Sequence, residues 1–378
     1  MEKKTIYLDN AATTKTLEAA VEVALRYFDV EYFNPSALYG KSIEVARDIK
    51  KAREDIAREL GVEPDTLVFT SSGSESDNQA LFCSHKKKGS KILISATEHS
   101  AVYNSAMELK QRGYEVEVVA VDESGKVDLE DLERKLDERV SLVSAMHVNN
   151  VTGAINDLKK ISELVKSKSE ALLHSDGVQA FGKMKVKPKT LGVDFYSASS
   201  HKIGAPKGSG FLYVKKGLSV APLIYGGGQE RGLRSSTENV PCIMAFAKAS
   251  GIAVKNIDAL NRKSEEFFGK IKEFAAERND VKVICPSGAP HILCLAFEKA
   301  RGETLMHALE EYGYITGIGS ACSSKKKTAR IPEALGLKNG YEEGMLRISI
   351  NPYDDYDAED FIAALNEAYE TLKKYVRV

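Results

Sequence analysis

The chain has 378 residues and a formal net charge of −1, and 43% of its residues are hydrophobic and 28% are charged. This length exceeds that of a usual single domain, so we expect two domains. The balanced charge gives no electrostatic case for binding nucleic acid or an acidic membrane surface, and no apolar run approaches the roughly 20 residues that span a bilayer. Five scattered cysteines and an N-terminus without an apolar signal core favour a cytoplasmic protein with free thiols.

The first sixty residues predict two helices separated by a loop. A short apolar stretch at residues 5–8 ends at the Asp-Asn-Ala-Ala of residues 9–12, and residues 17–27 have helical spacing. Pro35 disfavours a helix at the residue before it, so residues 32–36 are expected to form a loop. Apolar residues then recur at helical spacing from Ile43 to Leu60, and Gly61 supplies a stop.

From residue 67 onward, strand patterns alternate with helix patterns. This alternation predicts a mostly parallel sheet that is covered by helices on both faces. Ligands of such sheets bind at the carboxyl ends of the strands. Five residues of possible functional importance fall just after expected strands, which strengthens the case for a site at this edge: Gly73, His99, Asn150, Asp176 and Lys202.

Residues 67–78 combine a strand, a turn of small residues and the start of a helix. The free backbone N–H groups and the positive dipole end of such a helix can bind an anion. A serine-rich N-terminal cap without any ligand is the alternative, and it has comparable weight when this stretch is taken alone. His99 likewise opens a helix, where a lone histidine is more often a cap or a surface residue.

The stretch at residues 195–214 places a lysine on a loop between two strands. Lys202 follows the apolar run of residues 195–198, and Gly204, Pro206 and Gly208 force an irregular turn before the next strand at residues 211–214. A partly desolvated lysine amine has a lowered pKa and can form a Schiff base with a carbonyl. Together with the neighbouring small hydroxyls, it suggests pyridoxal phosphate, although a solvated surface lysine is the commoner case.

The last third of the chain predicts a second, smaller domain. Three consecutive glycines at residues 226–228 precede a long helical region, about residues 237–277, which is expected to break near Asn256. Strands are expected near residue 281 and at residues 292–297 and 346–350, with a final helix capped by Asp357. We therefore expect a large domain at residues 15–255, and a small domain formed by residues 1–14 and 256–378.

The remaining cysteines do not predict a metal site. Cys83 and Cys242 lie on expected helical segments and are interpreted as packing residues. Cys285, His291 and Cys294 provide three ligands at irregular spacing on expected strands, unlike the usual tetrahedral zinc patterns. We expect no bound metal.

Several motifs resemble those of cysteine desulfurases of the NifS/IscS type, which are pyridoxal-phosphate enzymes of the class V aminotransferase superfamily. The resemblance spans nearly the whole chain, in order and at the right spacing. It rests on Tyr-Leu-Asp-Asn-Ala-Ala-Thr-Thr at 7–14, Asn-Pro-Ser at 34–36, Ser-Glu-Ser-Asp-Asn at 74–78, Thr-Glu-His at 97–99, His-Val-Asn-Asn at 147–150, Ser-His-Lys at 200–202, Gly-Gly-Gly-Gln-Glu-Arg-Gly at 226–232 and Gly-Ser-Ala-Cys at 319–322.

The resemblance implies an α/β fold of the pyridoxal-phosphate fold type I, with a mostly parallel sheet in a large cofactor domain. A smaller α+β C-terminal domain would carry the loop of the catalytic cysteine. The implied protein is a homodimer that acts on L-cysteine and hands sulfur to a protein acceptor, either an iron–sulfur scaffold or a tRNA-thiolation protein.

The resemblance also assigns roles to single residues. Lys202 resembles the Schiff-base lysine that moves a proton at Cα, His99 would stack on the ring and take part in proton transfer, and Cys322 would attack the substrate sulfur as a thiolate. Asp176 would pair with the ring nitrogen and Gln179 with the ring hydroxyl.

Other residues are implied in binding. The cofactor phosphate would be held by Gly73, Ser74, Ser199 and His201, together with Thr237 from the partner subunit. Asn150, which also belongs to the implied cofactor site, would bind the substrate carboxylate with Arg347, and Asn34 would assist them.

This sequence departs from the family pattern at some positions. Val151 and Thr152 replace an acidic-apolar pair, and the Ser-Ser-Lys-Lys-Lys after Cys322 is more basic than usual. These departures bear on the sulfur acceptor and on the loop of Cys322. Two other hypotheses stand beside the desulfurase. One is a selenocysteine lyase or another class V aminotransferase, and Cys322 argues against a plain aminotransferase, which needs no such thiol. The other is an idle assembly scaffold, which would be expected to lack Lys202, Asp176 or His99.

Overall fold

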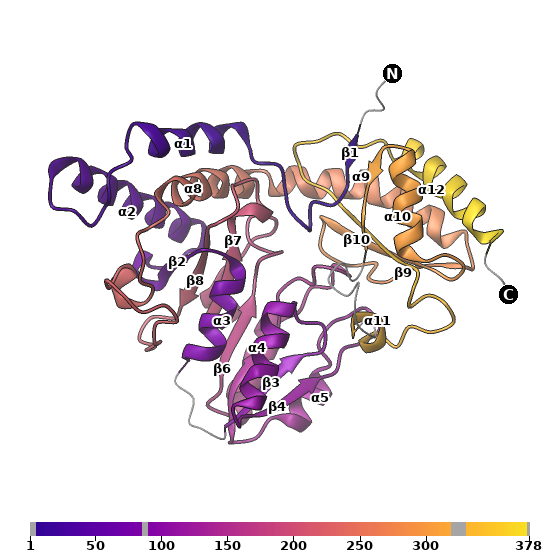
Figure 1. Cartoon of the computed structure of the whole chain (residues 1–378). Helices are drawn as coiled ribbons and strands as arrows, with labels where there is room; N and C mark the ends of the chain where they lie inside the picture. The colour runs from indigo at the N-terminus through magenta and orange to yellow at the C-terminus, as the bar shows by residue number, and fades with distance from the viewer. Residues whose placement is uncertain (1–4, 85–89, 319–329, 376–378) are drawn as a thin grey trace.

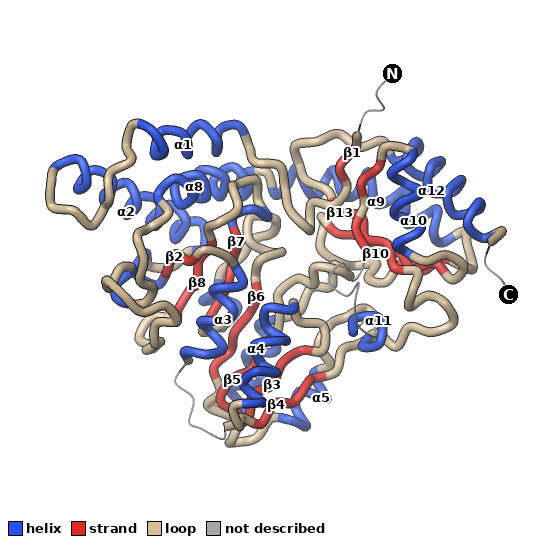
Figure 2. The backbone as a smooth tube through the Cα atoms, viewed as in Figure 1, coloured by secondary structure: helices blue, strands red, loops and turns tan. Residues whose placement is uncertain are grey.

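The computed structural model describes residues 5–84, 90–318 and 330–375. Figure 1 shows the chain from the N-terminus to the C-terminus, and Figure 2 shows two separate groups of strands with helices beside each. The expected α/β class is confirmed, because one large mixed sheet is mostly parallel and a second, smaller sheet is antiparallel.

The large sheet has seven strands in the order β2-β8-β7-β6-β5-β3-β4. Strands β7, β6, β5, β3 and β4 are parallel neighbours, whereas β8 is antiparallel to both β2 and β7. The strands are β2 (Leu67–Thr70), β3 (Lys91–Ser95), β4 (Glu115–Val119), β5 (Val140–Ser144), β6 (Leu172–Asp176), β7 (Phe195–Ser199) and β8 (Gly210–Val214). β8 is antiparallel because the glycine-rich turn after Lys202 returns the chain directly, with no α-helix between β7 and β8.

Helices pack against this sheet and against each other. In Figure 1, α3 and α4 lie across the strands, while α1, α2 and α8 form a layer beside β2 and β8. The helices are α1 (Glu18–Asp29), α2 (Gly40–Leu60), α3 (Gly73–Cys83), α4 (Ser100–Gln111), α5 (Leu129–Lys135), α6 (Leu158–Lys168), α7 (Pro188–Leu191) and α8 (Val240–Lys255), with short 3₁₀ turns η1 (Pro64–Thr66), η2 (Ser200–Lys202) and η3 (Glu230–Gly232).

The α2 helix illustrates how the sequence pattern becomes packing. Val45, Ile49, Ile56 and Leu60 are buried on one face, and the helix ends at Gly61, which adopts a left-handed φ of 66°. A residue with a Cβ is disfavoured at that φ, so glycine terminates the helix as expected.

The C-terminal residues build the second sheet around their own core. Its order is β12-β13-β10-β9, all antiparallel, and β1 (Ile6–Tyr7) pairs in parallel with β11 in a separate two-stranded sheet. The elements are α9 (Ile257–Ala276), β9 (Val281–Val283), β10 (Ile292–Phe297), α10 (Gly302–Glu311), β11 (Tyr314–Ile315), β12 (Gly317–Ile318), α11 (Arg330–Ala334), β13 (Met345–Ser349) and α12 (Ala358–Lys373). Leu8 belongs to the hydrophobic core of this part of the chain, so the N-terminal strand packs with C-terminal residues.

The expected break near Asn256 is present, because α8 and α9 meet there at a bend of 59°. No single helix among the described residues is long and apolar enough to cross a membrane. The bent pair α8 and α9 passes that test of length and composition only when its two helices are taken together.

A first prediction concerns Gly177, which follows β6 directly. A Cβ at this position would overlap the ring of the fully buried Tyr196, whose hydroxyl is hydrogen-bonded to His147 Nδ1 at 2.9 Å. We expect Gly177→Ala to lower the free energy of unfolding by about 1–3 kcal/mol, because neither the backbone nor the ring has space to move.

Gly251 provides the matched control within α8. A Cβ there meets no atom within 4 Å, so Gly251→Ala should raise the free energy of unfolding by roughly 0.5–1 kcal/mol. Urea unfolding of both variants measures the two effects, and equal stability of Gly177→Ala and the parent chain would contradict the packing argument.

Candidate active site

The site lies where the sequence analysis expected it, at the carboxyl ends of the parallel strands. Asp176 is the last residue of β6 and Ser199 is the last residue of β7, while Lys202 closes the 3₁₀ turn η2 that follows. The backbone leaves each of these strands at the same edge of the sheet, which brings residues far apart in sequence together.

Lys202 is fixed by the N-terminal segment. Its Nζ donates hydrogen bonds to the carbonyl oxygens of Ala11 and Ala12, each at 2.7 Å. Burial, followed by the Arg347 cation and opposed by Asp176, lowers the pKa of this amine from 10.5 to about 8. Near neutral pH a useful fraction of the amine is therefore uncharged and nucleophilic.

Asp176 is a buried carboxyl group in acidic surroundings. Its Oδ1 accepts a hydrogen bond from the Val178 N–H at 2.9 Å. A carboxylate oxygen of Asp176, a carboxylate oxygen of Asp77 and a ring nitrogen of His99 all lie within 4.8 Å of one another. Burial, followed by the charge of Asp77, raises the pKa of Asp176 to about 6. A cationic group placed beside it would reverse this effect and favour the ionised form.

Two further carboxyl groups are buried around Asp176. Burial raises the pKa of Asp77 to about 7, and burial with the charge of Asp176 raises that of Glu98 well above its usual range. Glu98 Oε1 accepts a hydrogen bond from the Met146 N–H at 2.7 Å, while Asp77 lies 3.4 Å from His174 Nε2. This side of the site is therefore acidic and suits the protonated ring nitrogen of pyridoxal phosphate.

The start of α3 forms a cradle for an anion. Gly73 opens this 11-residue helix, and Ser72 caps it by accepting a hydrogen bond from the Glu75 N–H at 3.2 Å. A Cβ on Gly73 would lie 2.5 Å from a Val178 methyl group and 3.5 Å from Ser199 Cβ. The backbone thus approaches β7 closely, and the first helical amides are open to a phosphate.

Gln179 connects to Lys202 through one shared acceptor. Its Nε2 donates to the Ala11 carbonyl oxygen at 2.8 Å, the same oxygen that accepts from Lys202. Its Oε1 accepts from the Nζ of Lys183 at 3.0 Å. The sequence analysis did not single out Lys183, because the Ala-Phe-Gly-Lys of residues 180–183 matches no recognisable motif.

Arg347 of β13 approaches the same region from the second sheet. One terminal nitrogen donates to the Asn150 carbonyl oxygen at 2.7 Å, and the other donates to Asp9 Oδ1 at 2.6 Å. Its Nε is buried without a hydrogen-bond partner among the described residues. A Cβ on Gly317 would collide with both Asp9 and Arg347, so glycine leaves room for this pair. Two of the five N–H donors of the guanidinium are used in these bonds, so donors remain for a carboxylate, the Nε–H among them.

The remaining predicted residues are placed as follows. His99 is exposed and caps α4 by accepting from the Ala101 N–H at 3.2 Å, and Ser74 is exposed on the first turn of α3. His201 Nδ1 shares a hydrogen bond with Thr13 Oγ1 at 3.0 Å, and burial followed by the charge of Lys202 lowers its pKa to about 4. The imidazole of His201 is therefore neutral at physiological pH.

Three predicted residues do not join this cluster. Asn34 is exposed on the loop before α2, where its side chain accepts from the Ser36 N–H. Thr237 is exposed and lines a separate cavity of about 210 Å³ with Ser71 and Arg234. Cys322 lies outside the described residues, and so does the expected Gly/Ser loop around it.

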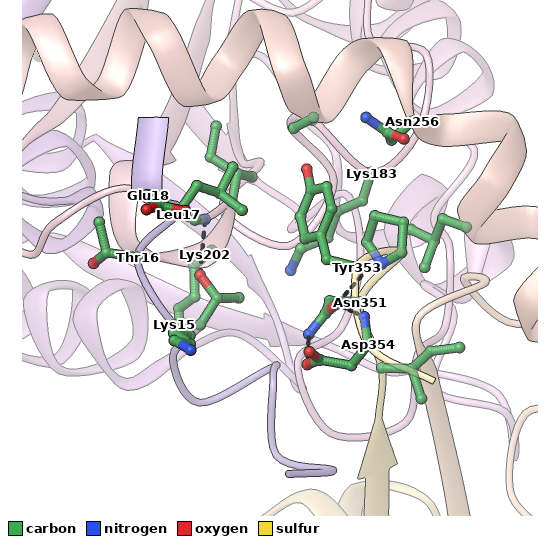
Figure 3. A pocket seen from close by; sticks show the side chains of 18 of the residues that line it. Lys15, Thr16, Leu17, Glu18, Lys183, Lys202, Asn256, Asn351, Tyr353 and Asp354 are labelled. Atoms are coloured by element: carbon green, nitrogen blue, oxygen red, sulfur yellow. Dashed lines mark hydrogen bonds between the residues drawn. The ribbon is translucent and has the colours of Figure 1, made fainter. Parts of the chain in front are cut away.

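A larger cavity of about 490 Å³ lies on the other side of Lys202. It is also lined by residues 14–18, Lys183, Asn256 and residues 350–354 (Figure 3). The N-terminal segment and both parts of the chain that meet at the α8–α9 bend therefore bound this cavity. Apolar atoms form most of its wall, which distinguishes it from the polar edge that carries Asp176 and Gly73.

We predict that Lys202 reacts as an unusually acidic lysine. In cofactor-free protein, its modification by trinitrobenzenesulfonate should rise with pH and reach half its maximal rate near pH 8, because only the neutral amine attacks the reagent. Peptide mapping over a pH series measures this midpoint, with Lys202→Ala as the control for peptide assignment. A midpoint near the ordinary value of 10.5 would contradict the effect of burial.

Comparison with known proteins places the chain in a family. The family model described as "Aminotransferase class-V" matches residues 6–360. The chain is 37% identical to the "NifS/IcsS protein homolog" of Lactobacillus delbrueckii subsp. bulgaricus, covering 98% of each protein. It is 35% identical to "Cysteine desulfurase IscS" of Clostridium botulinum, covering 95% of this chain and 92% of that one.

Solved structures agree with this relationship. A "NIFS-like protein" superposes with a TM-score of 0.89 at 35% identity and covers 98% of this chain and 100% of that one. The structure titled "SspA in complex with cysteine" has a TM-score of 0.79 at 27% identity, covering 93% and 100%. The match thus runs through both sheets and through every strand end that carries a candidate residue, and the chain belongs to the class-V aminotransferase family.

Proposed function

We propose that this protein is a cysteine desulfurase that converts L-cysteine to L-alanine and carries the sulfur as a persulfide of Cys322. The observation that carries the proposal is the convergence of Lys202, Asp176 and Arg347 on one strand edge, in a chain about 35% identical to cysteine desulfurases. The buried amine with a lowered pKa supports carbonyl chemistry, and the arginine supports an amino-acid substrate.

The class-V family uses pyridoxal 5′-phosphate, and the residues present fit this cofactor. When bound, it supplies an electron sink for charge that develops at the substrate Cα. Lys202 would hold it covalently, Asp176 would keep its ring nitrogen protonated, and Gln179 would donate to its ring hydroxyl. The phosphate would lie at the cradle formed by Gly73, with Ser74, Ser199 and His201 beside it.

Arg347 and Asn150 are proposed to bind the substrate carboxylate. The guanidinium is held in place by Asp9 and by the Asn150 backbone, and its unpartnered Nε is free to donate. Lys202 would then move the Cα proton, because an amine with a pKa of about 8 can both accept and release a proton near neutral pH. His99 would assist in proton transfer from its position beside Asp176.

Cys322 is proposed as the sulfur nucleophile. Its thiolate would attack the substrate sulfur, so that an S–S bond forms while the Cβ–S bond breaks and its electron pair remains on the carbon side. Protonation of that carbon gives alanine, and the enzyme retains the persulfide. The balance is L-cysteine plus the Cys322 thiol giving L-alanine plus the Cys322 persulfide. Its sulfur would pass to a protein acceptor, such as an iron–sulfur scaffold or a thiolation protein.

A homodimer and two domains are part of the proposal. Apolar side chains stand exposed at one end of the molecule, including Phe28 at 65%, Tyr32 at 67% and Leu38 at 94% of their full surface. Contiguous exposed apolar patches of this kind are typical of protein interfaces, and a partner there would allow Thr237 to act across the interface. The proposed domains are residues 15–255, and residues 1–14 with 256–378, supported by the separate hydrophobic cores.

The cytoplasm is the proposed location. The four cysteines that the structure describes form no disulfide, which is typical of a reducing compartment. Asn34 lies on an exposed loop away from Lys202. Its proposed role in carboxylate binding therefore requires that this loop of one subunit reaches the site of the other.

The dimer is tested with Phe28→Glu at the exposed end of α1. A buried carboxylate without a counter-ion opposes association, so we expect a shift from dimer to monomer in sedimentation velocity. Tyr375→Glu is the control, because Tyr375 is also exposed, at 79% of its full surface, and follows α12, which lies at the other end of the molecule from α1 (Figure 1). Dimers of unchanged stability in Phe28→Glu would contradict the proposed interface.

The activity is tested by measuring alanine and sulfide from cysteine in the presence of dithiothreitol. Lys202→Ala should lower turnover by about 10²–10⁴-fold, because the proton transfer at Cα loses its base. Cys322→Ser should retain the yellow cofactor and respond spectrally to cysteine, yet form no persulfide and almost no sulfide.

Cys83→Ser serves as the control for replacing a thiol, since Cys83 lies on α3 and is half-buried. Peptide mapping of the sulfur label after one turnover identifies the carrier. A label on a cysteine other than Cys322, with sulfide production preserved in Cys322→Ser, would overturn the assignment.

A further inference from the structure

Lys183 is a buried lysine next to the candidate site that no motif predicts. Only 7% of the residue is exposed, and it follows the turn that begins after β6. Its side chain lines the 490 Å³ cavity together with Lys202 (Figure 3). Lysine is rarely buried to this extent unless a partner neutralises it.

The surroundings of Lys183 do not supply that neutralisation. No carboxylate among the described residues lies within ion-pair distance of its Nζ, and the charged groups that act on it are Lys202 and Arg347. Its neighbour His291 is 1% exposed, and neither of the two ring nitrogens has a hydrogen-bond partner within the described ranges. Burial and these cations lower the pKa of Lys183 well below its usual range.

Such a placement opposes folding. Burying an amine beside cations costs free energy, whether the amine keeps its charge or gives up its proton, and an apolar side chain of the same length would not carry that cost. Buried ionisable groups with strongly shifted pKa values cluster at functional sites. Lys183 is hydrogen-bonded to Gln179, which is a proposed ligand of the cofactor. Its hydrogen bond therefore indicates what the lysine does there.

That hydrogen bond sets the orientation of Gln179. The amine of Lys183 donates to Gln179 Oε1 at 3.0 Å, so the amide oxygen must face Lys183 and the amide nitrogen must face away. The nitrogen then donates to the Ala11 carbonyl at 2.8 Å, beside the Nζ of Lys202. With the amide reversed, a nitrogen would face the Lys183 ammonium and an oxygen would face the Ala11 carbonyl.

We propose that Lys183 is a positioning residue that fixes the Gln179 amide with its nitrogen toward Lys202 and the cofactor ring hydroxyl. The inference rests on the proposed roles of Gln179 and Lys202. It assigns Lys183 no contact with substrate or cofactor, and it explains why a cation is kept where a hydrocarbon chain would fit. The donor orientation of Gln179 is the property that depends on it.

The test is Lys183→Met, which keeps the length of the side chain and removes its donor. We expect the dissociation constant of pyridoxal phosphate to rise about 10- to 100-fold, because the amide of Gln179 keeps only its bond to the Ala11 carbonyl and its oxygen is left unpaired. The visible absorption maximum should also shift, since the ring hydroxyl loses a fixed donor. The melting temperature of the cofactor-free variant should be unchanged or higher, because a buried cation has been removed.

Two variants separate positioning from a general effect. Lys183→Arg keeps the charge and the donor, and the adjacent cavity has room for the larger group, so it should restore most of the affinity and the parental spectrum. Lys185→Met changes an exposed lysine two residues further on, and it should alter neither the affinity for pyridoxal phosphate nor the visible spectrum. Cofactor titration, visible spectra and thermal melts are recorded for all variants.

The outcomes are distinct. Parental affinity and spectrum in Lys183→Met would overturn the inference, and so would a melting temperature that falls in parallel with affinity, since that identifies a structural lysine. Failure of the parent chain to bind pyridoxal phosphate through Lys202, judged by borohydride reduction and peptide mapping, would instead overturn the proposed site itself.

Discussion

The peptide at Ala11 is the point on which the site depends. Its N–H donates to Ser349 Oγ at 2.9 Å, and its carbonyl accepts from both Lys202 and Gln179. The two peptide groups that flank the Ala11 Cα are thereby held between a strand of the second sheet and two residues at the edge of the first. A displacement of Ala11 would move the shared acceptor of Lys202 and Gln179, so the proposed Schiff-base lysine and the proposed ring-hydroxyl donor both depend on its position.

Charge is segregated across the site. Asp77, Glu98 and Asp176 are buried on one side, and Lys183, Lys202 and Arg347 lie on the other. Pyridoxal phosphate has a matching polarity, because its ring nitrogen is cationic when protonated and its ring hydroxyl is anionic when ionised. The protein needs no reorganisation to stabilise that distribution, which is the condition for effective electrostatic catalysis. Burial is the first cause of both pKa shifts, and like charges add to it: Asp77 raises the pKa of Asp176 further, and Arg347 contributes to the lowered pKa of Lys202.

Sequence patterns predicted the strand edge well, because alternating strands and helices force the carboxyl ends of parallel strands together. Asp176 and Lys202 could be located by that rule, and motif resemblance added Gln179 and Arg347. The ion pair of Arg347 with Asp9 joins residues 338 positions apart, and no local spacing encodes such a contact. The hydrogen bond of Lys183 to Gln179 spans only four residues, but the burial of Lys183 beside Lys202 and Arg347 depends on tertiary contacts that no local pattern shows. Thr237 stands apart from the cluster within one chain, in keeping with its predicted role from the partner subunit. Asn34 also stands apart, and no pattern in the sequence indicated that position.

Arg347, the proposed ligand of the substrate carboxylate, is held in place while some of its donors stay unpaired. A guanidinium with no protein partner would sample many rotamers and lose entropy on binding substrate, whereas one with every donor satisfied would have to break bonds first. Here two nitrogens are anchored, by Asp9 and by the Asn150 carbonyl, and the buried Nε keeps one donor. A carboxylate arriving at Nε therefore gains a hydrogen bond that the unliganded site lacks. The Asp9 carboxylate also offsets part of the positive charge of Arg347. The site therefore favours a small carboxylate that accepts from the unpaired donor, and it disfavours a larger anion that could bind only by displacing Asp9.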